Sequence, residues 1–258
     1  MIEAAGKAAA SLLADYSNRG ALTVEHKGAG DFVSQADKKA EQILFDFLSE
    51  KFPEWGFVGE EGADTVGSDA RYRWIIDPLD GTTNFLQGIP YWAVSVGLEF
   101  NGEMIAGVVY DSVKNEIFAA EKGQGAYLNG TRIHVSDRTD LGNALVAVGI
   151  TGTRASRKKE MQAHVAKIND ACADLRRFAA CSLDMSYVAC GRLDAYAEYG
   201  VKPWDLGAGV VIVCEAGGFV TDLSGGTNMF ANQELLCGNP AIHAALTQLF
   251  EIKTAKAA

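Results

Sequence analysis

The sequence predicts an α+β first half and an α/β second half, and two patterns support this fold class. Between residues 91 and 128, short apolar segments alternate with turn residues, as in an antiparallel sheet. After about residue 140, strand patterns alternate with helix patterns, which is typical of a sheet covered by helices. We therefore expect two parts in the 258 residues, an N-terminal half over residues 1–140 and a C-terminal half over residues 141–258.

Two helices are expected before the buried strands at residues 57–58 and 74–76. Apolar residues recur at helical spacing between residues 2 and 16. The second helix is expected to begin at Ser34, a suitable N-cap, and to end at Phe52, because Pro53 follows. The apolar run at residues 8–14 is too short, and its start too weakly basic, for a signal peptide. No apolar stretch approaches membrane-spanning length, so we expect a cytoplasmic protein without a membrane partner.

The strands of the first half are predicted from apolar runs and turn residues. Segments 57–58 and 74–76 are expected to be buried strands, and each leads directly into acidic residues. Asn101-Gly102 is a strong hairpin signal between strands at 93–100 and 104–110. The remaining expected elements are strands at 116–120, 144–148, 194–198 and near Phe219 and Leu235, and helices at 157–173, 182–190, 205–215 and 243–250.

The segment from Trp74 to Phe85 carries the strongest functional signal. A buried strand is expected to end at Asp77, Pro78 to force a turn, and a short helix to begin at about Asp80. This spacing places the carboxylates of Asp77 and Asp80 on one rigid turn, where both can reach one or two hard cations.

The backbone of the same turn offers further ligands. The side chain of Leu79 cannot bind a cation, but its carbonyl oxygen can, as magnesium sites allow. The N–H groups of Gly81 and Thr82 stand at the N-terminus of the expected helix, which is a ready site for an anion such as phosphate. Metal ligands and a phosphate cradle would therefore come from one short turn.

Two further acidic motifs lie elsewhere in the chain. Glu60 follows an apolar strand and is bordered by glycines, and Asp205 begins a helix directly after Trp204. Taken singly, each motif is explained equally well by ordinary capping. Together with the two carboxylates of the turn, they predict a metal-dependent phosphatase.

The net charge of −10 argues against nucleic-acid binding, and bound divalent cations explain how so acidic a protein accepts a phosphate. A phosphatase of the haloacid-dehalogenase type is excluded, because Pro78 stands where its Asp nucleophile would be, two residues before Asp80. No P-loop motif occurs, and none of the four histidines has a nucleophile elbow near it.

With these motifs, the chain resembles the inositol monophosphatase family over nearly its whole length. The match is carried by residues 59–61, 74–85 and 204–218. The resemblance implies a layered αβαβα sandwich of the inositol monophosphatase and fructose-bisphosphatase type. It also implies two or three Mg²⁺ ions per active site, sensitivity to lithium, and a homodimer.

The resemblance further implies which residues hold the metal ions. The first magnesium ion would be held by Glu60, Asp77 and the carbonyl of Leu79. The second would be held by Asp77, Asp80 and Asp205, and Glu60 would help to hold a weaker third ion.

Catalytic and substrate-binding roles are implied in the same way. Glu60 and Thr82 would orient the attacking water, and Asp37 would support Thr82. The loop at residues 25–30 resembles a mobile active-site loop of the family, although a glycine-rich hairpin tip explains it equally well. The residues expected to contact the substrate are Asp80, Gly81, Thr82, Ala180, Glu198 and Asp205.

One segment departs from the family pattern. Where the family usually has Gly, then Ser or Thr, then Ala, this chain has Ala179-Ala180-Cys181. That segment normally touches the organic part of the substrate, so the departure concerns substrate identity. We expect hydrolysis of a small phosphorylated polyol, inositol 1-phosphate, to inositol and phosphate. The alternatives are a histidinol-phosphate phosphatase, a broad sugar-phosphate phosphatase and, outside the enzymes, a regulatory binding protein on the same fold.

Overall fold

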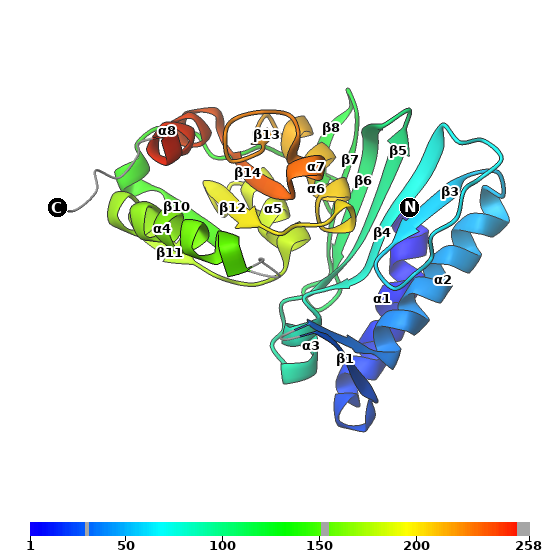
Figure 1. Ribbon diagram of the computed structural model, residues 1–258. Coiled ribbons are helices and arrows are strands. Elements are labelled where there is room, and N and C mark those ends of the chain that lie inside the picture. The colour runs from blue at the N-terminus through cyan, green and yellow to red at the C-terminus, as the bar shows by residue number, and fades with distance from the viewer. Residues whose placement is uncertain (29–30, 151–154, 252–258) are drawn as a thin grey trace.

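The computed structural model of the protein describes residues 1–28, 31–150 and 155–251. Its helices are α1 (Ile2–Ser17), α2 (Gln35–Lys51), α3 (Thr82–Gln87), α4 (Ala155–Ala171), α5 (Cys181–Ala189), α6 (Pro203–Glu215), α7 (Met229–Asn232) and α8 (Pro240–Glu251). Two sheets alternate with three helical layers: α1 with α2, then α5 with α6, then α4 with α8 (Figure 1). The layered αβαβα sandwich implied by the resemblance is therefore confirmed.

The two sheets divide the strands by their place in the sequence. The seven-stranded sheet has the order β3 (Gly56–Gly59), β4 (Tyr72–Asp80), β5 (Ala93–Phe100), β6 (Glu103–Asp111), β7 (Glu116–Glu121), β8 (Gly125–Leu128) and β9 (Thr131–Ile133). The five-stranded sheet has the order β11 (Asp174–Arg176), β10 (Leu145–Ile150), β12 (Ala195–Tyr199), β14 (Glu234–Gly238) and β13 (Phe219–Thr221). The predicted antiparallel hairpin is confirmed, since β5 pairs with β6 and the turn residues Asn101 and Gly102 have positive φ angles of 51° and 83°.

The first two helices form where the sequence predicted them, with two short strands between them. Ser34 caps α2, because its Oγ accepts the Ala36 N–H at 3.1 Å, and the Asp37 carboxylate accepts the Ser34 N–H at 2.9 Å. The strands β1 (Val24–Gly28) and β2 (Asp31–Ser34) pair as an antiparallel hairpin. The tip of the expected active-site loop, residues 29–30, lies outside the described residues.

The end of β4 differs from the prediction. The strand was expected to end at Asp77, but it continues to Asp80, with an irregular register against β5 between these two residues. Pro78 has no N–H for a regular ladder, and the Leu79 N–H donates to Asp77 Oδ1 at 3.0 Å instead of to a neighbouring strand. The irregularity replaces the expected turn, and α3 follows directly.

Close contact between α6 and the large sheet sets the position of the middle layer. A Cβ on Gly107 would clash with the backbone of Ala208, and one on Gly97 would come within 3.1 Å of the Gly207 carbonyl carbon. Glycines at these positions let the helix lie directly on β5 and β6. The N-terminus of α6 is thereby brought to the end of the sheet at which β4 finishes.

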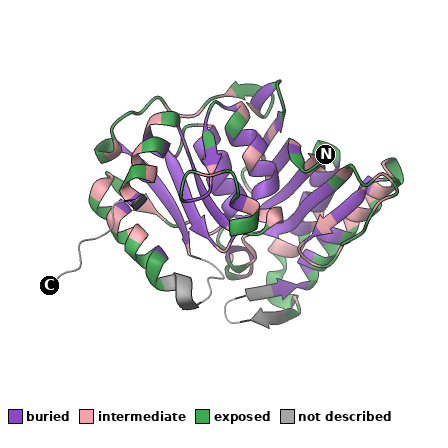
Figure 2. Ribbon diagram, turned by 45° about the horizontal axis from the view of Figure 1, so that its top comes forward, coloured by how far each residue is buried: buried purple, intermediate pink, exposed green. Residues whose placement is uncertain are grey.

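Buried residues follow the strands of both sheets, whereas exposed residues lie mainly on the outer helices and connections (Figure 2). One apolar core joins residues of both halves, among them Ile75 of β4, Val109 of β6, Leu206 of α6 and Tyr196 of β12. The division near residue 140 separates the two sheets but not this core, so the two-part organisation stays a prediction. Among the residues described, no helix combines the length and the apolar character needed to cross a membrane.

Candidate active site

Parallel pairing of β3 with β4 brings Glu60 and Asp77 together. The register sets Gly59 of β3 beside Ile76 of β4. The next residues along the two segments, Glu60 and Asp77, therefore lie side by side at the same end of the sheet. Asp77 is buried, whereas Glu60 is partly exposed. A glutamate and an aspartate thus stand next to each other where β3 ends and the irregular part of β4 begins.

Asp80, the last residue of β4, accepts hydrogen bonds from the N-terminus of α5. The Cys181 N–H donates to Oδ1 at 3.1 Å, and Ser182 donates to Oδ2 through its N–H at 2.7 Å and its hydroxyl at 2.5 Å. The N-cap of α5, Ala180, has no side chain able to do this. Burial raises the pKa of Asp80, and the hydrogen bonds from Ser182 and Cys181 oppose that rise.

Asp205 stands in the first turn of α6. Its Oδ2 accepts the Lys202 N–H at 2.6 Å, which fixes the start of the helix. Burial raises the pKa of Asp205 well above its ordinary value, and the charge of Asp80 raises it further. Asp80 is therefore near enough for its charge to act on Asp205.

The four carboxyl groups make one acidic cluster. Burial is the main cause that raises the pKa of Asp77 well above its ordinary value, followed by the charges of Glu60, Asp80 and Asp205. Carboxylates forced together in this way suit a hard divalent cation, which prefers oxygen ligands and removes their repulsion. The residues present therefore fit Mg²⁺.

The cluster is not arranged as a finished metal site. Across residues 1–28, 31–150 and 155–251, no three His, Cys, Asp or Glu side chains are spaced as a group able to hold a metal ion. Backbone N–H groups hold Asp80 and Asp205 in their present positions. The ligand roles of these residues stay predictions.

Thr82 and Asp37 are 45 residues apart in the chain and are joined by a hydrogen bond. Thr82 Oγ1 lies 3.0 Å from Asp37 Oδ1 and 3.0 Å from the carbonyl oxygen of Leu79, so its single proton can be donated to either. Asp37 is buried, and its other oxygen accepts the Ser34 hydroxyl at 2.6 Å. Burial raises the pKa of Asp37, and the hydrogen bonds from Ser34 and Thr82 oppose that rise.

Gly81 and Ala180, both expected at the substrate, lie in contact. A Cβ on Gly81 would come within 3.2 Å of the Ala180 Cβ and 3.0 Å of the Tyr91 carbonyl oxygen, and the φ of Gly81 is 93°. Ala179, which stands where the family usually has glycine, also has a positive φ, 65°. The departure noted in the sequence therefore places an alanine in a backbone conformation that favours glycine.

Glu198 lies on β12, buried and directly over Gly149 of β10. It accepts a hydrogen bond from the hydroxyl of Tyr196. The charge of Glu198 is among the causes that raise the pKa of Asp205, after burial and the charge of Asp80. Glu198 is thus near the acidic cluster but approaches it from the five-stranded sheet.

The sequence interpretation missed Glu41, which supports the loop that carries Glu60. Glu41 is buried on α2, and its carboxylate accepts the N–H of Glu61 at 2.8 Å and the N–H of Ala63 at 3.0 Å. Glu41 follows Asp37 by four residues on a helix, so the two acidic side chains share one face. Two acidic residues four positions apart on an otherwise apolar helix face are the sequence signal by which Glu41 could have been recognised.

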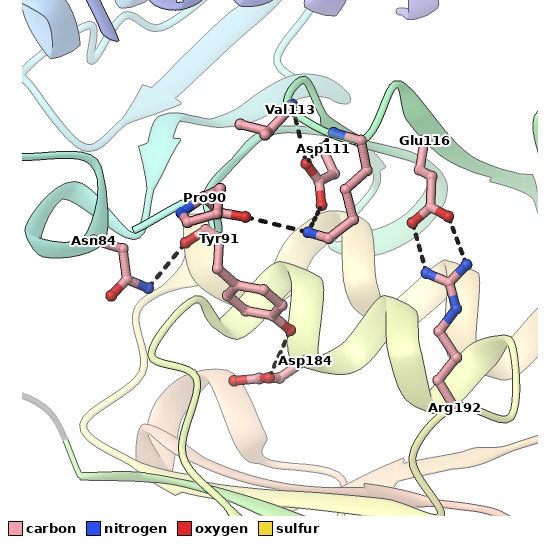
Figure 3. Close-up of polar contacts among 9 residues, drawn as sticks. Asn84, Pro90, Tyr91, Asp111, Val113, Glu116, Asp184 and Arg192 are labelled. Atoms are coloured by element: carbon pink, nitrogen blue, oxygen red, sulfur yellow. Dashed lines mark hydrogen bonds and ion pairs between the residues drawn. The ribbon is translucent and has the colours of Figure 1, made fainter. Parts of the chain in front are cut away.

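The sequence interpretation also missed a group of residues around Tyr91, whose hydrogen bonds connect the N-terminal half to the C-terminal half (Figure 3). The Asn84 side-chain amide donates to the carbonyl of Tyr91 at 2.9 Å and to the carbonyl of Phe178 at 2.7 Å. The Tyr91 hydroxyl donates at 2.9 Å to Asp184 of α5, whose buried carboxyl has a pKa raised well above its ordinary value, chiefly by burial. These contacts fix the segment that leads into Ala179 and Ala180.

The geometry defines a protein of the layered αβαβα class with an acidic site where β3, β4 and α6 meet. The sequence pattern of the inositol monophosphatase family matches residues 1–255. The chain belongs to the inositol monophosphatase family, which is magnesium-dependent.

Two curated relatives illustrate the range of names in the family. Inositol-1-monophosphatase of Mesorhizobium japonicum is 42% identical over 246 residues, covering 95% of this chain and 92% of that protein. Nus factor SuhB of Escherichia coli is 38% identical over 245 residues, with the same two shares covered. The family and the first of these names together indicate a phosphatase.

Solved structures show the same fold. The extragenic suppressor protein suhB from Bartonella henselae is 42% identical with a TM-score of 0.95, covering 98% of this chain and 97% of that one. The inositol monophosphatase from Anabaena is 33% identical with a TM-score of 0.83, covering 96% of this chain and 92% of that one. The layered fold is therefore shared over almost the whole chain.

Proposed function

We propose that this protein hydrolyses small phosphate monoesters with Mg²⁺, and that inositol 1-phosphate is among its substrates. The observation that carries the proposal is the convergence of four carboxyl groups, Glu60, Asp77, Asp80 and Asp205, beside the Thr82–Asp37 hydrogen bond. One side of the site can bind cations and the other can orient a water molecule.

The chain's own oxygen atoms would hold the metal ions. Glu60, Asp77 and the Leu79 carbonyl would hold the first, and Asp77, Asp80 and Asp205 the second. The Leu79 oxygen has two lone pairs, so it can accept from Thr82 and still face a cation. When bound, Mg²⁺ neutralises the phosphoryl oxygens and lowers the pKa of the attacking water.

Thr82 would orient the attacking water. Its proton is directed to Asp37 or to the Leu79 carbonyl, so the Thr82 oxygen is left to accept a hydrogen bond from the water. Asp37 keeps this orientation because Ser34 fixes its second oxygen. Glu60 would accept the proton that the water loses as its oxygen bonds to phosphorus. The bond from phosphorus to the alcohol oxygen would break in the same step, and that oxygen would take a proton from solvent water.

The phosphate and the organic part would be bound by different elements. Backbone N–H groups of Gly81 and Thr82, at the start of α3, would bind the phosphoryl oxygens. Glu198 and the segment around Ala180 would contact the leaving alcohol, beside Asp80 and Asp205. Because Ala180 has no hydroxyl to offer a polyol, we expect broad specificity.

Glu198 separates the first choice from the histidinol-phosphate alternative. A substrate hydroxyl can still donate to an amide, so Glu198→Gln should reduce turnover of inositol 1-phosphate only modestly. A substrate ammonium would lose its counter-charge at this buried position, which costs roughly 2–5 kcal/mol, so turnover of histidinol phosphate should collapse.

The test is to measure kcat/KM with Mg²⁺ for the unaltered protein and for Glu198→Gln. The substrates are inositol 1-phosphate, glycerol 2-phosphate and histidinol phosphate. Comparable values for the first two substrates support the proposal. A preference of about a hundredfold or more for histidinol phosphate, roughly 2.7 kcal/mol, would overturn the substrate assignment.

A regulatory binding protein on the same fold is the alternative from outside the enzymes. All four proposed metal-binding carboxylates are present in this chain, which favours an enzyme over a protein that has lost turnover. Absence of turnover on every monoester of the panel, in a protein that still binds Mg²⁺, would favour the binding role. Cytoplasmic location, a homodimer and inhibition by lithium belong to the same proposal.

A further inference from the structure

The N-terminus of α5 is capped by a residue that comes from the other half of the chain. Its N-cap, Ala180, makes no side-chain hydrogen bond, so the first N–H groups of the helix need another acceptor. Asp80 provides it, although more than a hundred residues separate Asp80 from Cys181 and Ser182. The carboxylate proposed to hold a cation is therefore also the cap of a helix.

The two oxygens of Asp80 are used unequally. Oδ2 accepts both bonds from Ser182, the N–H at 2.7 Å and the hydroxyl at 2.5 Å, whereas Oδ1 accepts the Cys181 N–H at 3.1 Å. A carboxylate oxygen has about two lone-pair directions. Oδ2 thus accepts two short bonds from one residue, while Oδ1 accepts a longer one.

We propose that Ser182 is a positioning residue that fixes Oδ2 of Asp80, so that Oδ1 is the atom presented to a divalent cation. The role rests on the proposed function, because it acts through a proposed magnesium ligand. The Ser182 side chain is fully buried, so its hydroxyl has a single fixed environment rather than competing with water. Hydrogen bonds to a ligating carboxylate orient it, and removing one typically weakens metal binding by about 10–100-fold.

The test compares Mg²⁺ binding by the unaltered protein and four variants without substrate, two single serine variants and two in an Asp80→Asn background. Each protein is melted over a series of MgCl2 concentrations, and the shift from its own baseline in chelator gives an apparent Kd. For Ser182→Ala we expect the apparent Kd to rise about tenfold or more. Ser186→Ala is the matched control, because Ser186 is buried on the same helix and, among the described residues, its hydroxyl bonds to the Ser182 carbonyl at 2.8 Å and not to Asp80. The control should keep its Kd within about twofold of the unaltered protein.

A second comparison asks whether Ser182 acts through Asp80. In an Asp80→Asn background, adding Ser182→Ala should change the remaining Mg²⁺ affinity by less than about twofold, because the side chain that Ser182 positions is no longer a charged ligand. The same substitution should have its full effect when Asp80 is present.

The outcomes are distinguishable. If Ser182→Ala lowers the melting temperature in chelator but binds Mg²⁺ as the unaltered protein does, the Ser182–Asp80 bond only stabilises the start of α5 and the inference is refuted. Tighter binding would refute it too, because the hydroxyl would then be competing with the cation. If the unaltered protein itself binds no Mg²⁺, the proposed function fails rather than the role of Ser182 alone.

Discussion

Replacing Thr82 by alanine tests whether the Thr82 hydroxyl activates water. The change keeps the backbone N–H proposed to bind phosphate and deletes only Oγ1, which lies 3.0 Å from Asp37 Oδ1 and from the Leu79 carbonyl. Losing a group that positions a proton transfer should lower kcat by roughly two orders of magnitude, or about 2.7 kcal/mol, with KM little changed. The buried Asp37 also loses a hydrogen bond, so unfolding should become easier by about 1–3 kcal/mol.

The assay is steady-state hydrolysis of inositol 1-phosphate at saturating Mg²⁺, together with a melting curve for each protein. Thr82→Ser is the matched control, since it keeps the hydroxyl and removes only a methyl group, and its kcat should stay within about tenfold. A large rise in KM at unchanged kcat would show that Thr82 only binds. An equal loss in the serine variant would show that the hydroxyl is not the active feature.

The remaining predictions concern stability. Ala179 has a φ of 65°, so Ala179→Gly should stabilise the protein by about 1 kcal/mol and raise Tm by about 2–4 °C. Ala180 has a negative φ, and Ala180→Gly should lower Tm; opposite signs would contradict the strain argument. Burial raises the pKa of Asp184, so this group favours folding below its unfolded pKa and loses that contribution as pH rises through its folded pKa. Asp184→Asn keeps an acceptor for Tyr91 but cannot ionise, so its Tm relative to the unaltered protein should increase from pH 5 to pH 8. A constant difference over that range would show that folding does not raise the pKa of Asp184 into it.

Local patterns in the sequence predicted most of the fold. Ser34 as a cap and Asn101-Gly102 as a turn act within a few residues, and both formed as predicted. The end of β4 was predicted wrongly, because the expected turn at Pro78 is replaced by a bulge in which Asp77 accepts the Leu79 N–H. Such a bulge depends on the neighbouring strand, which a local pattern does not include.

The site could be predicted only in part for the same reason. The carboxylates stand at strand and helix ends, where the sequence pattern marks them, and parallel pairing then sets Glu60 beside Asp77. The cap that Asp80 gives to α5 joins residues about a hundred positions apart and depends on how the two halves pack. Glu41 was missed because its partners are the N–H groups of a loop that no motif identifies.

The dependence of turnover on magnesium tests the central claim most directly. The full-length protein is treated exhaustively with chelator, assayed on inositol 1-phosphate, and assayed again after Mg²⁺ is restored, beside Asp205→Asn as a variant that keeps the side-chain size. We predict no turnover in chelator, full recovery with Mg²⁺, and a loss of roughly two or more orders of magnitude in kcat/KM for the variant, with its fold intact. Undiminished turnover after complete removal of divalent cations would contradict the account.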